Sequence, residues 1–82
     1  MALTITRPAQ PSNFTDGTGR TAVVRNGSGQ HFLISEVHRS PFPGHRIDET
    51  MVFRCNSEGN VTEWSEVFCG HSIEDALQNF RG

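Results

Sequence analysis

The sequence predicts an α+β fold, in which an antiparallel sheet of four to five strands carries one short C-terminal helix. Two observations lead to this prediction. Between residues 20 and 68, short β-rich runs alternate with turn sequences, which is typical of consecutive hairpins. Residues 72–80 then repeat apolar side chains at the spacing of one helical face. With 82 residues, the chain is expected to form one small domain that spans residues 1–82.

The first 19 residues are predicted to form an edge strand and then a loop rich in proline and glycine. Leu3 and Ile5 alternate with threonines, which favours a strand. Residues 7–19 hold two prolines and two glycines, which are typical of a loop. Phe14 is expected to anchor that loop to the body of the domain.

Residues 20–82 are predicted to form β-hairpins followed by the helix. Asn26-Gly27 is a strong hairpin sequence, because it tolerates the positive φ angles of a tight turn. Gly59 is placed for the left-handed position of a second turn. The four strands expected around these turns are residues 20–25, 30–37, 50–55 and 61–68.

The C-terminal helix has an N-cap, a charge pattern and an apolar face. Ser72 suits the N-cap, and acidic residues at 74 and 75 suit the positive end of the helix dipole. Arg81 would complement the opposite end. The apolar stripe consists of Ile73, Ala76, Leu77 and Phe80.

This helix is too small to cover one face of the predicted sheet. A helix of nine residues is about 13 Å long and roughly 10 Å wide, whereas four strands span about 19 Å. Apolar residues also occur at consecutive strand positions, such as Phe32 and Leu33, and would therefore point to both faces of the sheet. Either the loop that carries Phe14 or a second copy of the chain must cover the remainder. We therefore hypothesise a homodimer or a tight partner contact.

The segment of residues 38–46 is predicted to be a connecting loop, because Pro41 and Pro43 lack the N–H that a sheet ladder needs. It is also the best candidate contact surface. Pre-ordered prolines lower the ordering cost of binding, and an aromatic ring beside arginines suits a protein groove or a nucleic-acid backbone. In the alternative interpretation, the aromatic ring packs into the core. The candidate contact residues in this loop are Arg39, Phe42, His45 and Arg46.

Trp64 is the only tryptophan of the chain. In a small sheet a lone tryptophan is expected in the core. The alternative is an interface anchor, because tryptophan is enriched among binding hot spots. Trp64 therefore joins the candidate contact residues.

An enzyme is not predicted, and neither is a metal or other cofactor. Among two cysteines and four histidines, Cys69 and His71 are the only close pair, and no standard zinc spacing is present. Cys55 and Cys69 are expected to be reduced and to behave as small hydrophobic residues. No nucleophile elbow, phosphate loop or paired-carboxylate motif occurs.

The charges are unevenly distributed. Residues 1–46 hold five arginines against two acidic residues, and residues 47–82 hold two arginines against seven acidic residues. This asymmetry suggests oriented association, but it falls short of the basic patch of a nucleic-acid binder. The chain has no export signal and no apolar stretch of membrane-spanning length. A cytoplasmic protein without membrane contact is expected.

Three segments form a pattern that resembles small proteins encoded by mycobacteriophages and related actinobacteriophages. They are residues 25–32 (Arg-Asn-Gly-Ser-Gly-Gln-His-Phe), residues 49–53 (Glu-Thr-Met-Val-Phe) and residues 58–67 (Glu-Gly-Asn-Val-Thr-Glu-Trp-Ser-Glu-Val), followed by a glycine and an acidic helix. The resemblance covers most of residues 20–80 and brings no catalytic motif. The absence of lysine is compatible with such a GC-rich source.

The resemblance implies a non-enzymatic phage accessory protein that binds a host protein in the cytoplasm of the bacterial host. One alternative is a virion component or a self-assembling structural protein. Another is a nucleic-acid-binding module that uses the arginines of the N-terminal half.

Overall fold

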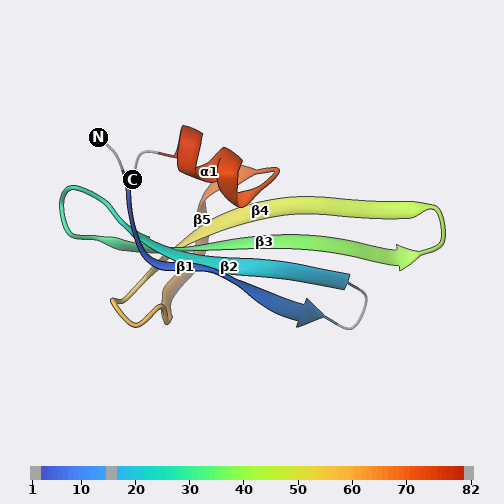
Figure 1. Cartoon of the computed structure of the whole chain (residues 1–82), viewed down its shortest axis with the longest axis horizontal. Helices are drawn as coiled ribbons and strands as arrows, with labels where there is room; N and C mark the ends of the chain where they lie inside the picture. The colour runs from blue at the N-terminus through green and yellow to red at the C-terminus, as the bar shows by residue number, and fades with distance from the viewer. Residues whose placement is uncertain (1–2, 15–16, 81–82) are drawn as a thin grey trace.

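A computed structural model describes residues 3–14 and 17–80 of the chain (Figure 1). Five antiparallel strands form one sheet in the order β1-β2-β3-β4-β5, so that each strand pairs with its neighbours in sequence. One short helix follows the last strand, as the sequence predicted. The elements are β1 (Thr4–Phe14), β2 (Gly17–Arg25), β3 (His31–Phe42), β4 (His45–Cys55), β5 (Val61–Gly70) and α1 (Ile73–Asn79).

The core lies between α1 and one face of the sheet. Ala22, Ile34 and Val52 occupy matching register positions on three adjacent strands, and all three are buried. Paired residues lie on the same face, so these side chains form one apolar row under the helix. The complete cluster of buried residues is Ala22, Val24, Phe32, Ile34, Val52, Ile73, Ala76 and Phe80.

The helix begins and packs as its sequence predicted. The Ser72 side chain accepts a hydrogen bond from the Asp75 N–H at 3.0 Å and so caps the first turn. Ile73 and Ala76 are buried against the sheet. The Phe80 ring follows the last turn and is also buried. Arg81 lies outside the described residues.

The opposite face of the sheet is partly covered by the chain itself. Val23 is 1% exposed and Phe53 is 8% exposed, although α1 lies on the other side. A Cβ atom built on Gly59 would lie 3.1 Å from the Val23 side chain and 3.0 Å from the Arg7 guanidinium. The turn between β4 and β5 and the side chain of a β1 residue therefore reach over this face. The anchoring role predicted for the Phe14 side chain lies outside what the structure describes.

The prediction of a loop at residues 7–19 is wrong, because all the described residues of this segment belong to β1 or β2. Pro8 and Pro11 are tolerated because β1 is an edge strand, whose outer side needs no hydrogen-bond donors. Two register shifts between Ile5 and Gln10 accommodate the irregular part of this strand.

The predicted loop at residues 38–46 is also wrong, because β3 and β4 continue through it as a hairpin. Pro43 and Gly44 form its turn, and Gly44 has a φ of +80°. Proline followed by a glycine of positive φ is typical of a type II turn. A register shift between Arg39 and Phe42 accommodates the other proline of the segment.

The continued hairpin makes the molecule elongated, with extents of 43 × 23 × 22 Å. We call residues 39–46 the arm. All eight residues of the arm are exposed. Figure 1 shows that the joined ends of β3 and β4 project at one end of the long axis, away from α1.

The β2–β3 and β4–β5 hairpins share one turn design. The Asn26 side chain accepts hydrogen bonds from two backbone N–H groups within its turn, and the Asn56 side chain does the same. The positive φ angles lie at Gly29 (85°) and Gly59 (88°). Gly59 therefore has the predicted left-handed conformation. In the β2–β3 hairpin, Gly29 takes the role that the sequence assigned to Gly27.

Candidate interaction surface

Three large hydrophobic side chains are exposed in the described part of the chain. They are Ile5 at 50%, Phe42 at 59% and Trp64 at 76%. Two of the three belong to the candidate contact residues predicted from the sequence. Exposed aromatic side chains are typical anchors of binding surfaces.

Phe42 and His45 form the end of the arm. They are the last paired residues of the hairpin, and their rings stack with centroids 4.7 Å apart and an interplanar angle of 23°. The Ser40 hydroxyl donates a hydrogen bond to the His45 carbonyl at 3.0 Å. The alternative in which Phe42 packs into the core is therefore wrong. The turn instead holds two flat rings together in solvent.

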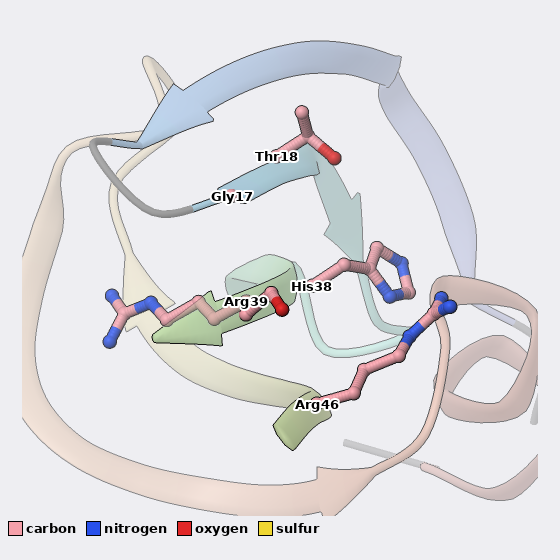
Figure 2. A pocket seen from close by; sticks show the side chains of 6 residues that line it. Gly17, Thr18, His38, Arg39 and Arg46 are labelled. Carbon is pink, nitrogen blue, oxygen red and sulfur yellow. The ribbon is translucent and has the colours of Figure 1, made fainter. Parts of the chain in front are cut away.

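An open pocket of about 300 Å³ lies at the base of the arm, beside the start of β2 (Figure 2). In Figure 2 the Arg46 side chain extends towards His38, and the Arg39 side chain points in another direction. A Cβ atom on Gly17 would collide with the carbonyl oxygen of His38. The close contact between the start of β2 and β3 therefore requires glycine at position 17. The pocket is lined by Gly17, Thr18, His38, Arg39, Ser40 and Arg46.

Glu36 is a buried carboxylate at the junction of the sheet and the helix. Its residue is 2% exposed, and it accepts hydrogen bonds from Arg20 at 2.8 and 2.9 Å and from the Ile73 N–H at 2.8 Å. Chiefly because Arg20 donates to it, the pKa of Glu36 falls to about 2. The carboxylate therefore stays charged and ties the first turn of α1 to β2 and β3.

His38 connects Glu36 to Asp48, which lies near the arm. Its Nδ1 lies 2.7 Å from Asp48 and its Nε2 lies 3.1 Å from Glu36. These two carboxylates, Asp48 foremost, raise the pKa of His38, because the protonated ring can donate to both of them. Arg46 Nε donates to the Asp48 carboxylate at 3.0 Å. We call the connected side chains the charge network, which consists of Glu74, Arg20, Glu36, His38, Asp48 and Arg46.

The charge network predicts that stability depends on pH through His38. Because the folded-state pKa of His38 is raised above its ordinary 6.5, its stabilising contribution is complete below that pH. The contribution is lost as the pH rises through the raised folded-state value. Urea unfolding of the wild type should therefore show falling stability as the pH rises above 6.5. His38→Gln should lack this decline, and a decline of equal size in both proteins would contradict the prediction.

Trp64 lies on β5 at an irregular part of the edge of the sheet. Val52 pairs with Phe68 and Arg54 pairs with Glu63, so four residues of β5 face a single residue of β4. The Trp64 ring packs edge-on against a β4 side chain, Phe53, with centroids 5.4 Å apart. The predicted core position of Trp64 is therefore wrong. Its 76% exposure fits the interface-anchor alternative.

The arm and Trp64 are separate surfaces. Phe53, which contacts Trp64, pairs with Leu33. Leu33 and Phe42 are nine residues apart on β3, or about 30 Å along a strand. The structure thus brings together Arg39, Phe42, His45 and Arg46, and it leaves Trp64 elsewhere on the sheet.

Sequence reasoning missed the charge network. The spacing of Glu36 and His38 could have placed both on one face of a strand, because side chains alternate. Their partners Arg20 and Asp48 lie opposite them on β2 and β4. Identifying those partners needs the register, which no local pattern in the sequence reveals.

The two cysteines are free and differ in exposure. Burial raises the pKa of the Cys55 thiol. The exposed Cys69 thiol donates to Glu66 at 3.3 Å, and that contact raises its pKa. A raised pKa favours the protonated thiol, which is a poor nucleophile. Within residues 3–14 and 17–80, no three histidine, cysteine, aspartate or glutamate side chains form a group that could hold a metal ion.

Taken together, these elements define a five-stranded antiparallel meander with one helix on one face, a projecting arm and an exposed tryptophan. No protein-family model, curated protein or solved structure matches the chain. Over the described residues, α1 is the one helix, and it falls short of the length and apolarity that crossing a membrane requires.

Proposed function

We propose that this protein acts by binding another macromolecule, without catalysis, and that the arm is its contact surface. The observation that carries the proposal is the stacked pair of Phe42 and His45 at the exposed end of a hairpin. Aromatic and arginine side chains are enriched in protein interfaces, and the arm also carries Arg39 and Arg46. Its narrow, pre-ordered turn limits the entropy lost on binding.

The partner in this proposal is a protein of a bacterial host, and the place of action is the host cytoplasm. A phage origin is supported by the resemblance of residues 20–80 to small actinobacteriophage proteins. A protein partner is favoured over nucleic acid because Arg20 is tied to Glu36 and Arg46 is paired with Asp48. The net charge of −2 also opposes a general attraction to phosphate backbones.

A tagged pull-down from a lysate of an actinobacterial host tests the role of the arm. Phe42→Ala is expected to reduce recovery of the partner by at least about tenfold, as truncation of a hot-spot residue does. Ile5→Ala is the matched control, because Ile5 is similarly exposed on a different strand. Equal recovery by both variants, with unchanged circular dichroism, would remove the arm from the contact surface.

A further inference from the structure

The arm leaves the five-stranded sheet as a ribbon of two strands. On one side, β2 pairs with β3 as far as Gly17, which lies opposite Arg39. On the other side, β5 pairs with β4 as far as Gly70, which lies opposite Thr50. Figure 1 shows β3 and β4 continuing past the end of β2. A hairpin without further neighbours is at best marginally stable in water, so the order of the arm depends on the contacts at its base.

His38 lies at this base and connects the arm to the body of the protein. It pairs in register with Asp48, and its Nδ1 lies 2.7 Å from the Asp48 carboxylate. Its Nε2 lies 3.1 Å from the buried carboxylate of Glu36. That carboxylate is held in turn by Arg20 and by the Ile73 N–H. One imidazole ring therefore links β4 at the base of the arm to the junction of the sheet and α1.

The charged groups around His38 come from its own strand and from the elements packed beside it. Two carboxylates face the ring directly, and the other groups reach it through those carboxylates. The residue opposite the ring on β2, Thr18, carries no charge. Within residues 3–14 and 17–80, the charged groups are Glu36 on β3, Asp48 and Arg46 on β4, Arg20 on β2 and Glu74 on α1. Hydrogen bonds to Asp48 first and to Glu36 second favour the charged ring and raise the pKa of His38.

The ring can donate to both carboxylates only when it is protonated. A protonated imidazole has two N–H donors, whereas a neutral imidazole has one donor and one lone pair. After deprotonation, one carboxylate must face that lone pair. Glu36 is 2% exposed, so water cannot replace a lost donor there, whereas the Asp48 side chain is 40% exposed and can be hydrated. The neutral ring therefore keeps its proton on Nε2, towards Glu36, and releases Asp48.

Release of Asp48 removes a side-chain link at the point where the sheet narrows to two strands. Arg46, whose Nε donates to the Asp48 carboxylate at 3.0 Å, loses the same connection to the body. The pocket of about 300 Å³ lies beside this point, and both His38 and Arg46 line it (Figure 2). The side chains at the base of the arm therefore border open space into which they can move.

We propose that His38 acts as a pH-sensitive hinge, which orders the arm when the ring is protonated and loosens the arm when the ring is neutral. The link is complete below the ordinary pKa of 6.5 and is lost as the pH rises through the raised pKa of the folded protein. The loss of order is confined to the arm and precedes unfolding of the domain. Its consequence for binding rests on the proposed function: a loosened arm loses more entropy on docking, so recovery of the partner should fall as the pH rises.

NMR relaxation of the isotope-labelled protein tests the hinge, because it measures backbone order on the picosecond-to-nanosecond timescale at each arm amide. As the pH rises, the order parameters of the arm are expected to fall from about 0.85 towards about 0.6, while those of the central strands stay near about 0.85. The fall should have the same midpoint as the titration of the His38 ring, which the chemical shift of its Cε1–H reports in the same samples.

Three variants separate the hinge from other effects of pH. His38→Gln removes the titrating ring, so the order of its arm should not change with pH. Asp48→Ala removes the carboxylate that the ring releases, so its arm should be loose at every pH. His31→Gln is the matched control and should keep the wild-type transition, because His31 lies on the same strand at the end far from the arm. The side chains of His38 and Asp48 are partly exposed, so these variants are expected to fold.

An arm whose order stays constant through the titration of His38 would overturn the inference, and so would a transition that persists in His38→Gln. Loss of order in all strands at the same midpoint would also contradict it, because the hinge predicts a change confined to the arm. A pH-dependent arm, combined with lysate recovery that ignores Phe42→Ala, would overturn the proposed function and leave the hinge standing. Recovery that depends on Phe42, combined with an arm of constant order, would overturn the hinge alone.

Discussion

Replacing Glu36 with alanine is expected to destabilise the fold by about 3 kcal/mol. The buried carboxylate accepts two hydrogen bonds from Arg20 and one from the Ile73 N–H. Its removal leaves a buried backbone donor and part of an arginine without their acceptor. The loss lies at the low end for broken buried pairs, because the Arg20 side chain is 41% exposed and water can reach it.

Glu74→Ala is the matched control for this prediction. Glu74 contacts the same Arg20 at 3.1 Å, but its side chain is 68% exposed. An exposed ion pair contributes at most about 1 kcal/mol. Urea unfolding followed by circular dichroism should therefore separate the two variants clearly. Similar losses in both would show that the burial of Glu36 does not matter.

Acid should abolish the difference between the wild type and Glu36→Ala. The pKa of Glu36 is lowered from 4.5 to about 2 in the folded state. The stabilisation is therefore complete above about pH 4.5 and is lost as the pH falls through the folded value. This loss occurs on the acidic side, whereas the His38 contribution is lost on the basic side. The two residues of one network thus stabilise the fold over different pH ranges.

The elements that the sequence predicted correctly depend on local patterns. The helix after Ser72 combines a cap with an apolar stripe, and both features act within a few residues. The β-rich sequences around Val23 and Val52 likewise predict strands from neighbouring residues alone. Such patterns are sufficient to predict hairpins and a helix, but they do not determine how far each strand extends.

The predictions that were wrong concern residues whose structure depends on where they lie in the sheet. Proline opposes a strand only where its missing N–H would face a neighbouring strand. Pro8 lies in an edge strand and Pro43 lies in a turn, so neither ends the sheet. Trp64 was expected in the core because it is large and apolar, but the irregular pairing of β5 carries it to the surface. Edge positions and irregular pairing are not visible in the local sequence.

Replacing Phe80 with alanine is expected to cost about 3–5 kcal/mol, the usual loss for a buried phenylalanine. The Phe80 ring packs against Phe32 at 4.9 Å and against Phe68 at 5.8 Å. Its residue is 7% exposed, so truncation leaves a cavity between α1 and the sheet. In a domain of this size, whose total stability is about 5–15 kcal/mol, the loss is large.

The same truncation at Phe42 is the control, because the arm residue is 59% exposed and should change stability by no more than about 0.5 kcal/mol. Phe80→Ala should also release the helix before the sheet unfolds. A helix of seven residues is too short to persist alone, so α1 depends on its contacts at both ends. Glu36 holds its first N–H, and Phe80 fixes its last turn to the sheet. Hydrogen exchange should therefore show selective loss of protection in α1, and uniform loss over all strands would contradict this account.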